Sequence, residues 1–126
     1  MIITRRALLL AAPPLVTAAY AGGLEPMSLQ VARYKVAPPA WPRGFSLKIA
    51  VVADVHACNP WMSVARIEGI VETTNALRPD VIVLLGDYVA AHNKITSIVA
   101  DADWARALAA LRAPSGVCAV LGNHDW

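Results

Sequence analysis

Residues 47–56 read LKIAVVADVH, an apolar run that ends in an aspartate and a histidine. Two later stretches have the same form: residues 81–87 read VIVLLGD, and residues 117–125 read VCAVLGNHD. Short runs rich in β-branched residues are typical of strands that are buried on both faces of a parallel sheet. We therefore predict three such strands, over residues 47–53, 81–85 and 117–121.

Helical patterns fill the two gaps between these strands. Residues 63–77 carry apolar side chains at helical spacing and are followed by Pro79. Residues 103–111 repeat the pattern, and Asp103 is a suitable N-cap for that helix. The order strand–helix–strand–helix–strand predicts an α/β fold with a parallel βαβαβ core and right-handed crossovers.

The chain before residue 47 divides into two segments. Residues 1–21 combine Arg5 and Arg6 with an apolar run and an Ala-Tyr-Ala sequence, which is typical of an export signal and resembles the twin-arginine type. We therefore expect the twin-arginine export machinery as a partner, and a location in the periplasm or at the outer face of the cytoplasmic membrane. An uncleaved leader would act as a membrane anchor. Residues 22–46 hold a predicted extra strand over 29–36 and a proline-rich connector over 37–44.

Composition excludes several other classes of protein. The 126 residues are 57% hydrophobic and 16% charged, which fits one folded domain and excludes intrinsic disorder. The chain has 11 basic and 9 acidic residues, and Arg5 with Arg6 account for the difference. Without a basic run or patch, we expect no nucleic-acid partner.

Polar residues follow each of the three predicted strands. Asp54 and His56 follow the first strand, Asp87 follows the second, and Asn123 follows the third. Parallel strands bring their carboxyl ends to one edge of the sheet, where ligands bind in open α/β folds. Two carboxylates in one cleft repel each other unless a cation lies between them, and mixed ligands of this kind suit Mn, Fe or Zn. Each motif alone is also compatible with an ordinary loop, so the prediction rests on their combination.

With these motifs in this order and spacing, residues 47–126 resemble the calcineurin-like metallophosphoesterases. The upstream residues 25–44 are also similar to the start of an exported bacterial subgroup, the YkuE-type phosphodiesterases. The resemblance implies one half of an αββα sandwich. The family's later Gly-His-x-His motif is not in this sequence, so we expect residues 47–126 to be the N-terminal portion of a longer enzyme, inactive or weakly active alone.

The resemblance also implies a two-metal site and a reaction. Asp54 and His56 would bind the first divalent ion, Asp87 would bridge both ions, and Asn123 would bind the second. The implied reaction is hydrolysis of a phosphomonoester or phosphodiester by attack of a metal-bound hydroxide on phosphorus.

Two further residues receive catalytic roles from the resemblance. His124 would contact the phosphate and protonate the departing oxygen, and Asp125 would orient the His124 imidazole. The expected substrate is a phosphate ester, with lipid-linked and cell-wall-linked phosphates among the candidates. A nuclease, a protein phosphatase and an exported metal-binding module without catalysis are the alternatives. His92, in the loop after Asp87, is either a substrate contact or a solvated loop residue.

Overall fold

The computed structural model describes residues 13–14, 16–18, 20, 28–90 and 95–126. It divides into two units, Met1–Lys35 and Val36–Trp126, and all the strands and helices discussed below belong to the second unit. Most of the predicted export signal lies outside the described residues, so it stays a prediction. No helix within the described ranges has both the length and the apolar character needed to cross a membrane.

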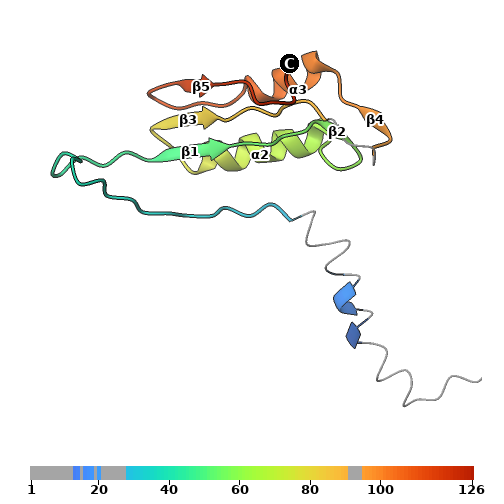
Figure 1. Cartoon of the computed structure of the whole chain (residues 1–126), viewed down its shortest axis with the longest axis horizontal. Helices are drawn as coiled ribbons and strands as arrows, with labels where there is room; N and C mark the ends of the chain where they lie inside the picture. Colours follow the sequence, from blue (N-terminus) through green and yellow to red (C-terminus); the bar gives the residue numbers. More distant parts are fainter. Residues whose placement is uncertain (1–12, 15, 19, 21–27, 91–94) are drawn as a thin grey trace, which may run out of the picture. The chain divides into compact units, whose positions relative to one another are not determined.

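The core of the second unit is a three-stranded parallel sheet (Figure 1). Its strands are β1 (Ile49–Val52), β3 (Val81–Leu84) and β5 (Val117–Ala119), in the order β1-β3-β5. Ala50 lies opposite Ile82, and Ile82 lies opposite Val117. The predicted parallel βαβαβ core is confirmed, with strands one to three residues shorter than the apolar runs.

Helix α2 (Val64–Ala76) follows the predicted boundaries closely. It begins after Ser63, whose hydroxyl oxygen accepts a hydrogen bond from the Arg66 backbone N–H at 3.4 Å. The hydroxyl thereby satisfies one of the N–H groups that have no partner in the first turn of a helix. The helix ends at Ala76 with Leu77 as its C-cap, and the buried ring of Pro79 follows.

Helix α3 (Asp101–Leu108) begins two residues earlier than the sequence pattern predicts. Its N-cap is Ala100, which supplies no side-chain hydrogen bond, so the prediction of Asp103 as N-cap is wrong. Asp101 and Asp103 instead lie in the first turn, where their negative charges interact favourably with the helix dipole. The helical pattern placed this helix correctly but not its first residue.

Two very short strands pair outside the main sheet. Strand β2 (Cys58–Asn59) runs antiparallel to β4 (Ser97–Ile98), and the Thr96 backbone N–H donates to the Asn59 carbonyl oxygen at 2.8 Å. Strands of two residues are too short to give an alternating pattern, so the sequence did not indicate them.

Both helices cover one face of the sheet. Ala50, Ile82 and Leu84 are buried on that face, in one apolar cluster with Ile67 of α2 and Leu108 of α3. The two helices also contact each other, which places them side by side.

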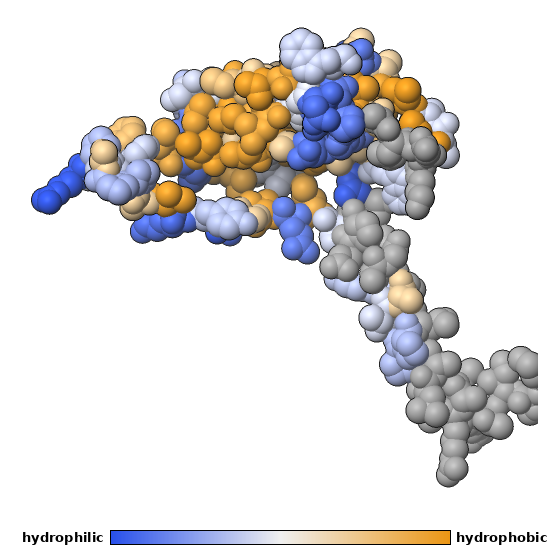
Figure 2. Space-filling model, in the orientation of Figure 1, coloured by the Kyte–Doolittle hydropathy of each residue, from blue (hydrophilic) through white to orange (hydrophobic). Residues whose placement is uncertain are grey.

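The other face of the sheet is apolar and exposed, as Figure 2 shows over the three strands. Ile49 and Val51 alternate with the buried Ala50 and are 50% and 57% exposed. Every residue of the edge strand β5 is exposed as well. The described residues leave this face uncovered because α2 and α3 pack on only one side, as expected for one half of an αββα sandwich.

The predicted strand over residues 29–36 is not formed. These residues belong to no strand and are all exposed. A β-strand is stabilised by hydrogen bonds to a neighbouring strand. No strand of the described chain pairs with this segment, so its alternating pattern does not lead to a sheet.

Candidate metal centre

The sheet brings the three polar motifs to one edge. The Asp54 backbone N–H donates to the Gly86 carbonyl oxygen at 3.2 Å, just beyond the ends of β1 and β3. The Val120 N–H donates to the Leu84 carbonyl oxygen at 3.0 Å, which continues the pairing of β5 with β3. Because the three strands are parallel, the residues that follow them meet at the carboxyl edge, as the sequence predicts.

The backbone at this edge has an unusual conformation. Asp54, His56 and Asp87 have φ angles of 52°, 43° and 56°, in the left-handed region that non-glycine residues rarely adopt. Each such residue costs about 1–3 kcal/mol and is typical of functional sites, where the surrounding structure holds the strain.

Two glycines allow the loops to approach each other closely. A Cβ atom at Gly86, where φ is 90°, would overlap the backbone of Gly122. A Cβ atom at Gly122 would overlap the Asp87 carboxylate and backbone nitrogen. Both positions therefore require glycine, because the second and third motifs contact each other there.

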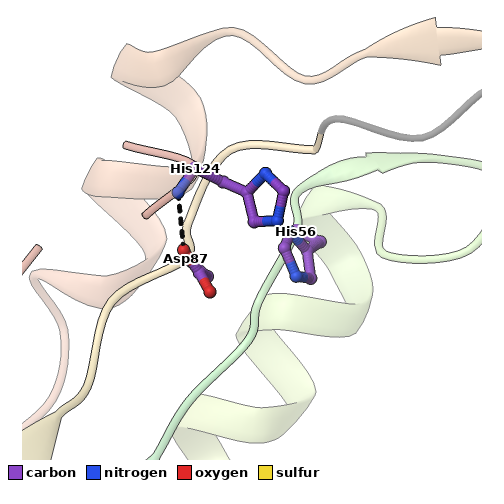
Figure 3. Close-up of side chains that lie close together, drawn as sticks. All are labelled: His56, Asp87 and His124. Atoms are coloured by element: carbon purple, nitrogen blue, oxygen red, sulfur yellow. Dashed lines mark hydrogen bonds between the residues drawn. The ribbon is translucent and has the colours of Figure 1, made fainter. Parts of the chain in front are cut away.

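Three side chains form a compact group of potential metal ligands (Figure 3). His56, Asp87 and His124 each offer one ligand atom, and these atoms lie within 4.8 Å of one another. The two imidazole rings have centroids 5.1 Å apart and meet edge to face, at 74°. The His124 backbone N–H donates to Asp87 Oδ1 at 2.8 Å, so the third motif holds the carboxylate of the second.

The chemistry of this group fits a divalent transition metal. Two imidazoles and a carboxylate are typical ligands of Zn, Mn or Fe, and they are unlike the thiolate sets of structural zinc sites. His56 Nδ1 lies 2.9 Å from the Val89 carbonyl oxygen. Since a carbonyl oxygen can only accept, Nδ1 carries the proton in this bond, and Nε2 keeps the lone pair that a metal requires.

The structure groups the predicted site residues differently from the sequence. His124, predicted as a phosphate contact, lies among the potential ligands. Asp54, predicted as a ligand beside His56, is exposed and does not belong to that three-residue group. Asn123 is exposed in the loop that carries His124. The ligand roles of Asp54 and Asn123 stay predictions, and His92 lies outside the described residues.

Asp125 has different partners from those predicted. Its carboxylate oxygens accept four backbone N–H groups, from Asp87, Tyr88, Val89 and Gly122, at 2.7 to 3.2 Å. None of the hydrogen bonds described for this carboxylate reaches the His124 imidazole, so the predicted orienting role is not supported. Burial raises the pKa of Asp125, but the four N–H bonds together outweigh it and hold the pKa below its ordinary value of 3.8.

Sequence reasoning missed two residues, Tyr88 and Val89, that hold the loops of the site together. The Tyr88 ring stacks on Trp104 with centroids 5.2 Å apart, and its hydroxyl donates to the Val120 carbonyl oxygen at 2.9 Å. Burial is the main cause that raises the pKa of Tyr88 above 10.0. Val89 acts through its backbone carbonyl, which any residue can supply, so the sequence contains no signal for it.

Comparison with known proteins agrees with this geometry. Residues 47–126 match the model of the calcineurin-like phosphoesterase family. An uncharacterized metallophosphoesterase of Aquifex aeolicus is 33% identical over 103 residues, which cover 82% of this chain and 37% of that protein. The putative metallophosphoesterase F40B5.2 of Caenorhabditis elegans is 39% identical over 82 residues, which cover 64% of this chain and 16% of that protein.

A further relative has a more specific name. The UDP-2,3-diacylglucosamine pyrophosphatase LpxG of Chlamydia trachomatis is 30% identical over 116 residues, which cover 91% of this chain and 34% of that protein. The chain thus spans about a third or less of the length of these curated relatives. No solved structure gives a significant match. The family match covers most of the chain and includes all three motifs, and the chain therefore belongs to the calcineurin-like phosphoesterase family.

Proposed function

We propose that this chain forms part of a metal-dependent hydrolase of phosphate esters, with its reaction at the sheet edge where His56, Asp87 and His124 meet. The observation that carries the proposal is the grouping of their ligand atoms within 4.8 Å. Family membership supports it as well. We further propose that two divalent ions, of Mn, Fe, Zn or a similar metal, occupy the site, and that residues outside this chain complete the ligand set.

The residues of the chain have distinct tasks in this proposal. His56 binds metal through Nε2, and Asp87 offers two carboxylate oxygens that suit a bridging ligand. Asp54 and Asn123 supply further oxygen ligands. When bound, the ions lower the pKa of water at the site and neutralise charge on the phosphate oxygens.

His124 has two candidate tasks that an experiment can separate. Its place in the ligand group favours metal binding. The family resemblance favours protonation of the departing oxygen, for which an exposed imidazole is suitable. If His124 is a ligand, His124→Ala weakens Mn²⁺ binding as much as His56→Ala does. If it is a proton donor, His124→Ala keeps the Mn²⁺ affinity and lowers only the turnover of substrate.

The test of the proposed function combines binding with hydrolysis. Isothermal titration of the 126-residue chain with Mn²⁺ should show saturable binding, and Asp87→Ala should weaken it by about tenfold or more, because a direct ligand is lost. Hydrolysis of bis-p-nitrophenyl phosphate with Mn²⁺ should be weak, because residues outside the chain complete the ligand set. Any such hydrolysis should fall in Asp87→Ala and disappear with EDTA. Hydrolysis that Asp87→Ala abolishes would exclude a non-catalytic metal-binding module, and absence of Mn²⁺ binding would contradict the proposal.

The relative named as a UDP-2,3-diacylglucosamine pyrophosphatase suggests one class of substrate to compare. We propose that a nucleoside diphosphate linked to a lipid or sugar is a better substrate than a simple monoester. Parallel assays with a UDP-sugar, bis-p-nitrophenyl phosphate and p-nitrophenyl phosphate test this. A preference for p-nitrophenyl phosphate would contradict it.

We also propose that the protein is exported by the twin-arginine route. The proposal rests on Arg5, Arg6 and the apolar run that follows them. Replacement of both arginines by lysine keeps the charge and should abolish export of a fused reporter. Unchanged export would indicate a general secretory signal instead.

A further inference from the structure

The carboxylate of Asp125 makes an unusually large number of hydrogen bonds to the backbone. Oδ2 accepts the N–H groups of Asp87 at 2.7 Å and Gly122 at 2.8 Å. Oδ1 accepts those of Tyr88 at 2.7 Å and Val89 at 3.2 Å. We call this arrangement the Asp125 clamp: one carboxylate and the four N–H groups that surround it. The clamp joins the second polar motif to the third.

The clamped segment 87–89 in turn holds the first motif. The Asp87 carbonyl oxygen accepts the His56 N–H at 2.9 Å, and the Tyr88 carbonyl oxygen accepts the Ala57 N–H at 2.7 Å. The Val89 carbonyl oxygen faces His56 Nδ1 at 2.9 Å. The N–H groups of these three residues thus point to Asp125, while their carbonyl groups fix both the backbone and the ring of His56.

All three members of the ligand group depend on this arrangement. Asp87 lies within the clamped segment, His56 is bonded to it, and His124 precedes Asp125 in the chain. The His124 backbone N–H also holds Asp87 Oδ1. Small displacements of the segment 87–89 would therefore change the positions of two potential ligands together.

The clamp requires a carboxylate rather than any polar side chain. Only an ionised carboxylate offers two oxygens, each able to accept two hydrogen bonds, with no donor of its own. An asparagine at this position would place an NH₂ group against two N–H donors and leave both without an acceptor. Charge also strengthens each bond, because hydrogen bonds to an ionised acceptor are stronger than neutral ones.

We propose that Asp125 is a positioning residue of the metal centre. It acts through the backbone of residues 87–89 and fixes the His56 and Asp87 ligands, rather than acting on the imidazole of His124. The expected effect of Asp125 on metal affinity rests on the proposed function. The clamp itself is independent of that function and can be measured without metal.

The experiment compares the full chain with Asp125→Asn and with Asp103→Asn as a matched control. Both variants lose one negative charge, but Asp103 is a surface residue of α3 that pairs with Arg106 at 3.1 Å. Amide hydrogen exchange, followed by NMR, should become at least tenfold faster at Asp87, Tyr88 and Val89 in Asp125→Asn only. The Mn²⁺ affinity of folded protein should fall by about tenfold or more in Asp125→Asn, as for other groups that orient ligands, and stay within about twofold in Asp103→Asn.

The two measurements separate the possible failures. A purely structural role would give faster exchange with unchanged Mn²⁺ affinity of the folded protein, and this would overturn the proposal. Unchanged exchange at residues 87–89 would overturn the clamp itself. If the wild-type chain bound no Mn²⁺, the proposed function would fail and the positioning role with it, while the exchange rates would still report on the clamp. If Asp125→Asn does not fold, Asp125→Glu keeps the charge, and its displaced carboxylate should still weaken Mn²⁺ binding.

Discussion

His56 Nδ1 lies 2.9 Å from the carbonyl oxygen of Val89, a residue of the loop that follows the neighbouring strand. This bond fixes which ring nitrogen of His56 carries the proton, and it fixes the rotation of the ring. It also connects the first polar motif to the second through the backbone. A histidine held in this way presents a defined lone pair to a metal, which is how supporting hydrogen bonds tune ligands in metal sites.

The first prediction concerns the protonation of His56. In the metal-free protein at neutral pH, we expect the neutral ring to carry its proton on Nδ1. Addition of Zn²⁺ should shift the ¹⁵N resonance of Nε2 and leave the Nδ1–H bond in place. Two-dimensional ¹H–¹⁵N NMR of the ring measures both effects. A proton on Nε2, or a Zn²⁺ shift at Nδ1, would contradict the geometry.

The second prediction concerns the contact between Gly122 and Asp87. A Cβ atom at residue 122 would overlap the Asp87 carboxylate and nitrogen, so Gly122→Ala must displace the carboxylate. We expect Mn²⁺ affinity to fall by about tenfold or more, as measured by titration calorimetry.

Gly69 is the matched control for this substitution. It lies in α2 with no atom near the position of an added Cβ. Gly69→Ala should stabilise the protein by about 0.5–1 kcal/mol, because alanine loses less conformational entropy in a helix. Equal Mn²⁺ affinity in the two variants would show that the close approach at Gly122 does not matter for binding.

The sequence predicted the strands and helices that position the site well, because these elements depend on local patterns. Apolar runs identified the three parallel strands, and the helical spacing identified α2 and α3. The polar residues after each strand then lie at one edge as a direct result of parallel topology. The glycines at 86 and 122 belong to the polar motifs, but the close approach of these two motifs, which requires glycine there, is a feature of the folded chain.

The remaining features depend on partners that no local pattern specifies. The sequence did not indicate the partners of Asp125, because its carboxylate accepts from backbone N–H groups, which every non-proline residue carries. The segment 29–36 alternates like a strand, but the described chain offers it no strand to pair with. Val51 is apolar but 57% exposed, since an apolar strand has the same sequence whether one face or both are covered.

The third prediction concerns acid stability and Asp125. Its pKa is held below the ordinary 3.8 in the folded protein, so the unfolded chain takes up the proton at a higher pH than the folded chain does. The stabilisation is therefore complete above the ordinary pKa and is lost as the pH falls through the lowered value. Chemical unfolding between pH 7 and pH 2 should show a smaller loss of stability in Asp125→Asn than in the wild type. A constant difference between the two across this range would contradict the prediction.

The fourth prediction concerns the missing cap of α3. Ala100 has the extended backbone of an N-cap, with φ −62° and ψ 142°, but no side chain that can accept a hydrogen bond. Ala100→Ser should therefore stabilise the protein by about 0.5–2 kcal/mol. Ser63→Ala, which removes the existing cap of α2, should destabilise it by a similar amount. Thermal or urea unfolding measures both changes, and a loss of stability in Ala100→Ser would show that α3 does not begin at Asp101.

The fifth prediction concerns the two faces of the sheet. Ile82 in the central strand is completely buried under the helices, whereas Val51 in the adjacent strand is 57% exposed on the other face. Ile82→Ala should cost about 2–5 kcal/mol, because it leaves a cavity that the surrounding side chains cannot fill. Val51→Ala should cost less than about 1 kcal/mol, mainly through lower β-propensity. Urea unfolding of both variants measures the difference. If Val51→Ala were as costly as Ile82→Ala, the exposed face would be covered in solution, since only packed surroundings give a truncated valine so large an effect.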